Sequence, residues 1–266
     1  MSSPTWDPAL YTAFGDYRSR PFYDLTARVA AEAPRRVVDL GCGPGELTAS
    51  LTQRWPDALI EGLDSSEEML DAARSRFAGR DRLTFTHGDI LHWEPEGDVD
   101  VVLSNAALQW VPGHLGLMGR WLDQLVPGAW LGVQVPGNFQ APSHTLMREL
   151  AESSQWEHRL RGVLRHTDAV AEPQAYLELM LEAGWEADVW ETVYYHQLVG
   201  EDAVLNWIRG TGLRPVLDVL SPEEGAQFEE QYDQLLLDAY PSVERDGLLT
   251  TLYPFRRIFC VGRKPS

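Results

Sequence analysis

The amino-acid sequence predicts an α/β protein built on a mostly parallel, seven-stranded sheet with helices on both faces. Apolar stretches rich in β-branched residues alternate with helical stretches through the first half of the chain. The first of these stretches ends at Asp39 and runs directly into a glycine-rich turn. A chain of 266 residues, 44% of them hydrophobic, is long enough for one such domain with insertions.

Five strands are expected before residue 137, because five short stretches are apolar and partly β-branched or aromatic. They cover residues 36–40, 59–63, 83–86, 99–104 and 129–135. One helix is expected from Glu46 through Arg54, and another begins at Ser65, where Ser65 and Glu68 have the spacing of a capping box. Strands that alternate with helices run parallel, so we expect a ligand beyond their carboxyl ends.

The second half of the chain is less regular but continues the same domain. Helices are expected at 141–155, at 173–183 and at least twice within 201–240, and strands at Glu186 to Gln197 and near 255–262. Residues of about 200–250 thus form a helical insertion between the last two strands.

The sequence contains no repeat or linker, so a single domain over 1–266 is expected. Within it, 1–30 form a helical cover, 31–137 the half with the glycine turn and 138–266 a second half with the helical insertion.

Composition excludes several classes of protein. A formal net charge of −18 argues against nucleic acid as a partner, because a phosphate backbone requires a basic face. No stretch has the length and apolarity of a membrane span or the pattern of a signal peptide. The two cysteines, Cys42 and Cys260, form neither a disulfide framework nor a metal-ligand pattern, so we expect a cytoplasmic protein without a metal. The sequence leaves the oligomeric state open, and a monomer is the expectation.

The glycine turn has the spacing Asp39-x-Gly41-x-Gly43-x-Gly45. Glycine lacks a Cβ, so such a turn can adopt positive φ and approach a nucleotide-like ligand closely. A dinucleotide fingerprint would be Gly-x-Gly-x-x-Gly, with the third glycine one residue later. The spacing instead resembles motif I of class I S-adenosylmethionine-dependent methyltransferases, which have a Rossmann-like fold.

This resemblance implies S-adenosyl-L-methionine as the cofactor and assigns further residues. Asp64 ends the next strand, at the position of the acidic residue that accepts hydrogen bonds from the ribose hydroxyls. Asp89 and Ile90 follow the third strand, where they can hold the adenine amine and ring. The expected cofactor-binding residues are Asp39, Gly41, Gly43, Gly45, Asp64, Ser65, Met69, Asp89, Ile90 and Asn105.

Narrower motifs resemble one family, the trans-aconitate 2-methyltransferases, over nearly the whole chain. These motifs are Trp6-Asp7-Pro8 with Leu10-Tyr11, Arg18-Ser19-Arg20-Pro21, Leu108-Gln109-Trp110, Tyr194-Tyr195-His196-Gln197 and Thr211-Gly212-Leu213-Arg214-Pro215. The stretch 155–172, rich in Arg and His, departs from the family pattern.

The family resemblance implies transfer of a methyl group to a carboxylate of trans-aconitate, giving a monomethyl ester and S-adenosyl-L-homocysteine. A carboxylate with a pKa near ~4 is already ionised at neutral pH, so no general base is required. Positioning is expected from Gln109, Trp110, Tyr195 and His196. The expected substrate-binding residues are Tyr11, Arg18, Trp110, Tyr194, Tyr195, His196, Arg209 and Arg214, because guanidinium groups pair with both oxygens of a carboxylate. Arg20, Arg256 and Arg257 are further candidates.

Three alternatives stay open. A methyltransferase of the same fold could act on another small acid, an amine or a phenol. A nicotinamide-dependent dehydrogenase is disfavoured by the glycine spacing. A non-catalytic protein that binds S-adenosylmethionine is compatible with every motif above.

Overall fold

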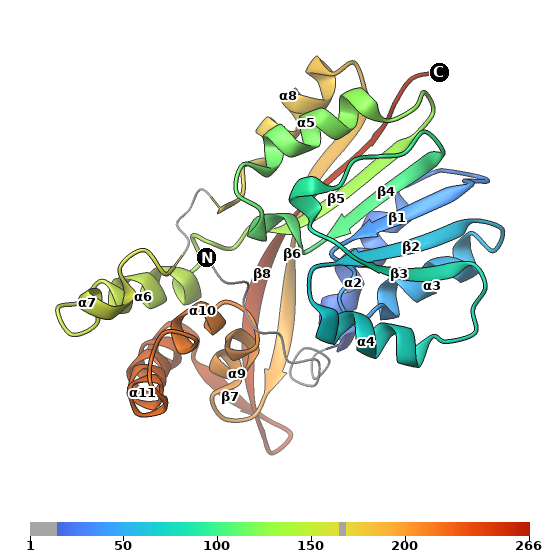
Figure 1. Cartoon of the computed structure of the whole chain (residues 1–266). Helices are drawn as coiled ribbons and strands as arrows, with labels where there is room; N and C mark the ends of the chain where they lie inside the picture. Colours follow the sequence, from blue (N-terminus) through green and yellow to red (C-terminus); the bar gives the residue numbers. More distant parts are fainter. Residues whose placement is uncertain (1–14, 165–168) are drawn as a thin grey trace. The chain divides into compact units, whose positions relative to one another are not determined.

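The computed structural model describes residues 15–164 and 169–266 (Figure 1). Contacts between Cα atoms divide the chain into two compact units. Unit 2 comprises residues 16–136, 170–192 and 257–266, and unit 1 comprises the remainder. The single domain over 1–266 remains a prediction.

The parallel strands of unit 2 confirm the five predicted from the sequence. They are β1 (Arg36–Leu40), β2 (Leu59–Asp64), β3 (Leu83–His87), β4 (Val99–Asn105) and β5 (Trp130–Pro136). The sheet order is β3-β2-β1-β4-β5-β8-β6, with β6 at Glu186–Val199 and β8 at Leu248–Arg263. The strand order reverses at β1, whose neighbours are β2 and β4, so ligands are expected beyond the carboxyl end of β1.

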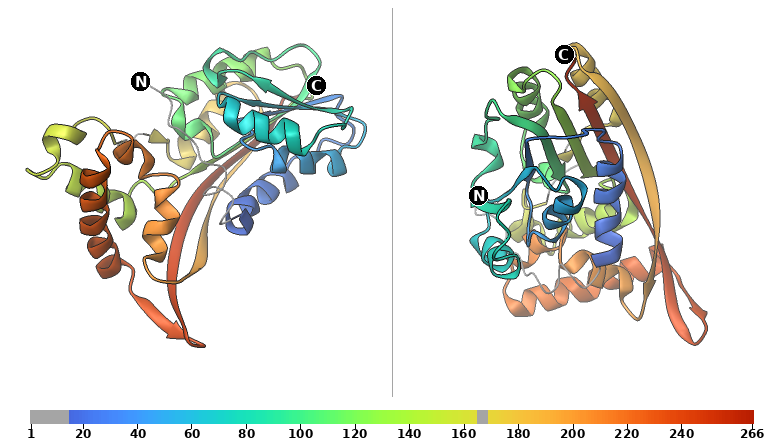
Figure 2. Two further views of the ribbon diagram at one scale, coloured as in Figure 1. Left: turned by 60° about the horizontal axis from the view of Figure 1, so that its bottom comes forward. Right: turned by 90° about the vertical axis from the view of Figure 1, so that its right-hand side faces the viewer.

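Helices cover both faces of this sheet (Figures 1 and 2). On one face, a Cβ added at Gly132 of β5 would lie 3.3 Å from Val29 and 3.6 Å from Leu25, so α2 (Gly15–Ala27) and the residues after it pack there. On the other face, the core cluster joins Val133 to Trp121 of α5 (His114–Gln124) and Met180 of α8 (Pro173–Glu182). Buried apolar side chains on both faces explain why the central strands read as continuous apolar runs.

Two helices follow the strands that carry the acidic residues. Helix α3 (Glu46–Arg54) begins directly behind the glycine turn, as predicted. Helix α4 (Glu67–Arg76) is capped by Ser66, whose side chain accepts a hydrogen bond from the backbone N–H of Met69. The prediction of Ser65 as the cap was wrong by one residue, because either serine of a Ser-Ser pair can fill that position.

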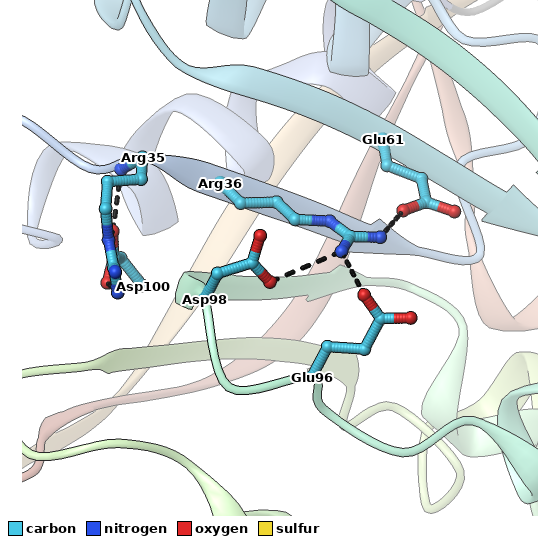
Figure 3. Close-up of polar contacts among 6 residues, drawn as sticks. All are labelled: Arg35, Arg36, Glu61, Glu96, Asp98 and Asp100. Carbon is cyan, nitrogen blue, oxygen red and sulfur yellow. Dashed lines mark hydrogen bonds and ion pairs between the residues drawn. The ribbon is translucent and has the colours of Figure 1, made fainter.

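The amino end of β1 is held by a network of ion pairs (Figure 3). Arg35 donates to both oxygens of Asp100, at 2.9 and 2.7 Å, and Arg36 lies 2.6 Å from Glu61 and 3.3 Å from Asp98. The hydrogen bond to Glu61 raises the pKa of Arg36 above its ordinary value, against the effect of burial. This network lies at the end of the strand opposite to the glycine turn, so it belongs to the scaffold.

Unit 1 contains the helical insertion and the helices that precede it. Its elements are α6 (Pro142–Ala151), α7 (Glu157–Leu160), α9 (Ala203–Arg209), α10 (Arg214–Leu217), α11 (Pro222–Ala239) and β7 (Ser242–Arg245). The predicted helix over 141–155 ends early, at Ala151, and a separate short helix follows it. Ser221 and Glu224 form a capping box that begins α11 after the turn that ends α10.

Strand β7 lies inside the stretch predicted as a helical insertion and brings the sheet to eight strands rather than seven. It pairs in antiparallel fashion with the first residues of β8, which therefore begins at Leu248 rather than near 255. Only Val243 is apolar in its four residues, so the hairpin leaves little pattern in the sequence. Within the predicted helical cover over 1–30, residues 15–27 form α2, residues 28–30 follow it without helical structure, and residues 1–14 lie outside the described residues.

Candidate active site

The glycine turn after β1 has two tightly packed positions and one open one. All three glycines are left-handed, with φ of 82° at Gly41, 55° at Gly43 and 76° at Gly45. A Cβ at Gly41 would lie 2.3 Å from the Cβ of Ala107, and one at Gly45 would lie 2.5 Å from the Phe85 ring. A Cβ at Gly43 would meet no described atom within 4 Å. The turn is therefore packed on both sides and open at Gly43, where a ligand can approach the backbone.

Asp64, at the carboxyl end of β2, is fixed against this turn by backbone donors. Its Oδ2 accepts from the N–H of Gly43 at 2.8 Å, and its Oδ1 accepts from the N–H of Ser66 at 2.9 Å. Each carboxylate oxygen retains a lone pair beyond these bonds, so Asp64 can also accept from ligand hydroxyls. The structure thus brings together the two strongest features of the predicted cofactor site.

The neighbouring predicted residues differ in exposure. Asp39 is 3% exposed and accepts from the hydroxyl of Thr48 at 2.6 Å, so its carboxylate is already engaged inside the protein. Burial raises the pKa of Asp39 to about 6, and the hydrogen bond from Thr48 opposes that shift. Met69 is 3% exposed in the core, while the backbone oxygen of Ser65 lies 3.2 Å from Nε2 of His87.

Asp89 and Ile90 lie at the start of a short 3-10 helix, η1 (Ile90–His92), after β3. Asp89 caps this helix by accepting from the N–H of Leu91 at 2.9 Å. The Cδ1 atom of Ile90 lies 3.6 Å from the Cβ position of Gly41, so its side chain borders the glycine turn. The contact of Ile90 with the adenine ring stays a prediction.

The loop after β4 carries a cluster of buried amides. Ala106 has a left-handed φ of 55°, and its N–H donates to the backbone oxygen of Gln134 in β5 at 2.9 Å. Gln109, in the 3-10 helix η2 (Leu108–Trp110), donates from Nε2 to the oxygen of Ala106 at 2.7 Å. Oδ1 of Asn105, Oε1 of Gln109 and both polar atoms of Gln134 are buried without a hydrogen-bond partner among the described residues.

Gln134 was missed by the sequence reasoning. A lone glutamine inside the apolar stretch Leu131 to Val135 was the signal that could have found it. Buried polar groups in folded proteins nearly always have partners, and those without one are candidates for ligand contact.

The aromatic string of β6, predicted to bind the substrate, separates onto two faces. Tyr194 and His196 are each 2% exposed and stack with nearly parallel rings at 6.3 Å, and His196 stacks on Trp207 at 4.7 Å. Tyr195 is 67% exposed on the opposite face. Side chains alternate along a strand, so one ligand cannot contact all three from one side.

The predicted arginines also differ in their surroundings. Arg18 of α2, in unit 2, is 8% exposed, and Arg214 is the first residue of α10 in unit 1 and half-buried. Arg209 is held by Glu229 at 2.6 Å. Arg20 is exposed near Asp24, Arg256 donates to the oxygen of Gly137, and Arg257 is buried. Tyr11 lies outside the described residues.

Unit 1 also contains a buried polar cluster that the sequence did not indicate. The N–H of Ser143 donates to the hydroxyl of Tyr240 at 3.0 Å, and its Oγ lies 3.1 Å from the hydroxyl of Tyr253. Nδ1 of His144 lies 3.2 Å from the same Oγ. Burial lowers the pKa of His144 to about 4, so this histidine is neutral at physiological pH.

In residues 15–164 and 169–266, no group of three or more His, Cys, Asp or Glu side chains could hold a metal ion. In the same ranges, no helix combines the length and apolarity needed to cross a membrane.

Comparisons with known proteins bear on the fold and the family of this chain. A family model described as a methyltransferase domain matches residues 37–128. Among solved structures, this chain is similar to a SAM-dependent methyltransferase from Geobacter sulfurreducens in complex with S-adenosyl-L-homocysteine. The match covers 98% of this chain and 99% of that protein, with a TM-score of 0.58 and 16% sequence identity. At this identity the likeness shows the fold, which is that of the class I methyltransferases.

Curated relatives are far closer in sequence. The trans-aconitate 2-methyltransferase of Streptomyces coelicolor is 51% identical, and the match covers all of this chain and 88% of that protein. The enzyme of the same name from Rhodococcus jostii is 53% identical, with 97% of this chain and 99% of that protein covered. This chain belongs to the trans-aconitate 2-methyltransferase family.

Proposed function

We propose that the protein transfers the methyl group of S-adenosyl-L-methionine to a carboxylate of trans-aconitate, giving the monomethyl ester and S-adenosyl-L-homocysteine. The observation that carries this proposal is identity of 51–53% to curated enzymes of that name along essentially the whole chain. The open glycine turn beside Asp64 supports the cofactor half of the reaction.

The residues around the turn fit the cofactor by their donor and acceptor chemistry. Asp64 has remaining acceptor capacity for the two ribose hydroxyls, and Ile90 borders the turn with an apolar side chain that suits an adenine ring. The side-chain oxygens of Asn105 and Gln109 are buried acceptors without a hydrogen-bond partner among the described residues. The ammonium group at the amino-acid end of the cofactor would supply the missing donors. When bound, S-adenosylmethionine supplies an electrophilic methyl group on a positively charged sulfur.

The task left to this chain is orientation and exclusion of water. An ionised carboxylate is already a nucleophile, so no side chain has to remove a proton from it. Holding the carboxylate oxygen in line with the methyl carbon and sulfur accounts for catalysis without a dyad. Arg18, Arg209 and Arg214 remain proposed partners of the acceptor's carboxylates. Trp110, Tyr194, His196 and Tyr11 remain proposed further contacts, whereas Tyr195 lies on the opposite face of β6 from Tyr194 and His196 and is not among them.

The proposal is tested by methyl transfer from labelled S-adenosylmethionine to trans-aconitate, cis-aconitate, citrate and isocitrate, with mass spectrometry of the products. A monomethyl ester formed preferentially from trans-aconitate supports the proposal. Tight binding of S-adenosylmethionine without turnover of any acid overturns it and favours a non-catalytic binding protein.

A pH–rate profile separates acid acceptors from amine or phenol acceptors. With an acid acceptor, kcat stays flat from about pH 6 to 9, because the carboxylate is ionised throughout. An amine or phenol acceptor must lose a proton, so kcat would rise with pH over the same range. The cytoplasmic location and the monomeric state also remain predictions.

A further inference from the structure

We propose that Gln134 of β5 is a ligand-binding residue whose buried amide donates a hydrogen bond to a carboxylate in the active site. This proposal rests on the proposed function, because two carboxylate sources follow from it. One is the acceptor acid, and the other is the amino-acid end of the cofactor.

The burial of Gln134 is the first observation. Its side chain is 0% exposed, and neither Nε2 nor Oε1 has a hydrogen-bond partner among the described residues. A buried amide without partners destabilises a fold, because its polar atoms have lost water and gained nothing. Such a residue is explained when a ligand completes its hydrogen bonds.

The position of Gln134 in the sheet is the second observation. It pairs in register with Asn105, the last residue of β4, on one side and with Phe259 of β8 on the other. Side chains paired across neighbouring strands share a face, so the amides of Gln134 and Asn105 lie on one face at the carboxyl end of the sheet. Gly132, two residues earlier in β5, shares that face, and α2 packs against it.

A chain of contacts connects Gln134 to the glycine turn. The backbone oxygen of Gln134 accepts from the N–H of Ala106, and the oxygen of Ala106 accepts from Gln109. Ala107, the next residue, approaches the Cβ position of Gly41 within 2.3 Å. Gln134 is therefore part of the structure that holds the loop after β4 against the turn.

The order of strands favours the acceptor as the source of the carboxylate. The proposed cofactor residues follow the sheet from Asp89 after β3, through Asp64 of β2 and the turn after β1, to Asn105 of β4. β5 is the next strand in that order and carries Gln134. A group bound at β5 lies beyond the cofactor's end of the row, where the molecule that receives the methyl group must sit.

The chemistry of the amide agrees with a carboxylate. Its NH₂ group offers two donors and no charge, so it can bind a carboxylate oxygen without holding it as tightly as a guanidinium does. A neutral partner is suited to a carboxylate that becomes an uncharged ester, because the contact does not depend on the charge that the reaction removes. We infer that Gln134 contacts the carboxylate that is methylated when the acceptor is the source.

The test compares Gln134→Leu and Gln134→Glu with wild type, and uses Val133→Ala as a matched control. Val133 is the preceding residue of β5, is 1% exposed and belongs to the core cluster on the opposite face. Four quantities are measured for each protein: Tm without ligand, the Kd of S-adenosylmethionine by calorimetry, and KM and kcat for trans-aconitate.

If the proposal holds, Gln134→Leu keeps or raises Tm, because it removes an unsatisfied amide, while KM for trans-aconitate rises tenfold or more. Gln134→Glu, which has nearly the same shape but repels a carboxylate, impairs the reaction further. Val133→Ala shows the opposite pattern, with a lower Tm and an unchanged KM.

The two sources of the carboxylate give different results. An effect confined to KM for the acid identifies the acceptor, and an effect on the Kd of S-adenosylmethionine identifies the cofactor. If Gln134→Leu leaves both constants unchanged, the proposal is overturned whatever the Tm, and a lowered Tm then assigns the amide a structural role. Failure of the proposed function can be told apart from failure of this proposal, because in that case the wild-type protein itself would turn over no acid.

Discussion

The backbone N–H of Gly43 donates to Oδ2 of Asp64 at 2.8 Å, which ties the turn after β1 to the acidic residue at the end of β2. Twenty-one residues separate the two in sequence. The parallel pairing of β1 with β2 brings their carboxyl ends together, with Leu40 opposite Leu63. One hydrogen bond thus joins the open position of the turn to the carboxylate that we propose accepts the ribose hydroxyls of the cofactor.

Substitution of Gly43 by alanine should reduce cofactor affinity with little effect on packing. The added Cβ meets no described atom within 4 Å. The free energy of unfolding should therefore fall only by the cost of holding alanine in a left-handed conformation, about 1–2 kcal/mol. Gly79→Ala is the matched control, with a φ of 82° and an equally open Cβ position. We expect the Tm of both variants to fall by similar amounts, and only Gly43→Ala to raise the Kd of S-adenosylmethionine tenfold or more. Equal affinities for the two variants would show that no ligand approaches Gly43.

Asp64→Asn should weaken binding of S-adenosylmethionine by about 10- to 100-fold, because a charged acceptor of hydrogen bonds becomes neutral. Calorimetric titration measures the Kd directly. Asp71→Asn on α4 serves as the control, since that side chain is 77% exposed. An Asp64→Asn variant with wild-type affinity would mean that the ribose is held elsewhere.

Asp39→Asn should change how stability depends on pH. The pKa of Asp39 is raised from 3.8 to about 6 in the folded protein, so between these values the folded state binds more protons than the unfolded state. The contribution of Asp39 to stability therefore falls as pH rises from about 4 to 6, and stays low above that. At pH 7.5 the Asn variant should be more stable, by about 1–3 kcal/mol.

Urea unfolding of the ligand-free protein at pH 4.5, 6 and 7.5 checks this expectation. The difference between the variant and the wild type should grow across that series. A difference that is constant with pH would show that Asp39 has the same protonation in the folded and unfolded states.

Arg214→Ala should raise KM for trans-aconitate tenfold or more and leave the Kd of S-adenosylmethionine within about twofold, because loss of a charge-assisted contact is worth about 1.5–3 kcal/mol. Arg161→Ala is the control, since the Arg161 side chain is 80% exposed and its ion pair is with Glu157, four residues earlier. Steady-state kinetics with each substrate varied in turn separates the two constants. Unchanged values for Arg214→Ala would remove this residue from the substrate contacts.

Much of unit 2 could be predicted from the sequence because its signals are local. Strands β1 to β5 are short apolar runs bounded by turns, and each appears within two residues of its predicted ends. The glycines at 41, 43 and 45 need positive φ, which the structure confirms. Motifs of this kind depend on backbone conformation, and backbone conformation is determined by neighbours in sequence.

Features that depend on pairing were harder to predict. Strand β7 has four residues and one apolar side chain, so only its antiparallel partner in β8 identifies it. The string Tyr194-Tyr195-His196 looked like one binding motif, but the alternation of a strand places Tyr195 on the other face. A string of similar side chains indicates a shared site only when the strand geometry allows it.

The sequence by itself determined the fold class, the glycine turn, the acidic residue at the end of the next strand and the family. The first three depend on local sequence patterns, and the family follows from sequence identity to known relatives. Only the tertiary structure decided which polar groups are buried without partners. Gln134 is two strands away from the turn, and its amide became conspicuous once β4, β5 and the loop after β4 were placed together. Burial and hydrogen-bond satisfaction are properties of the packed structure, since they depend on every neighbour of an atom and not on its place in the chain.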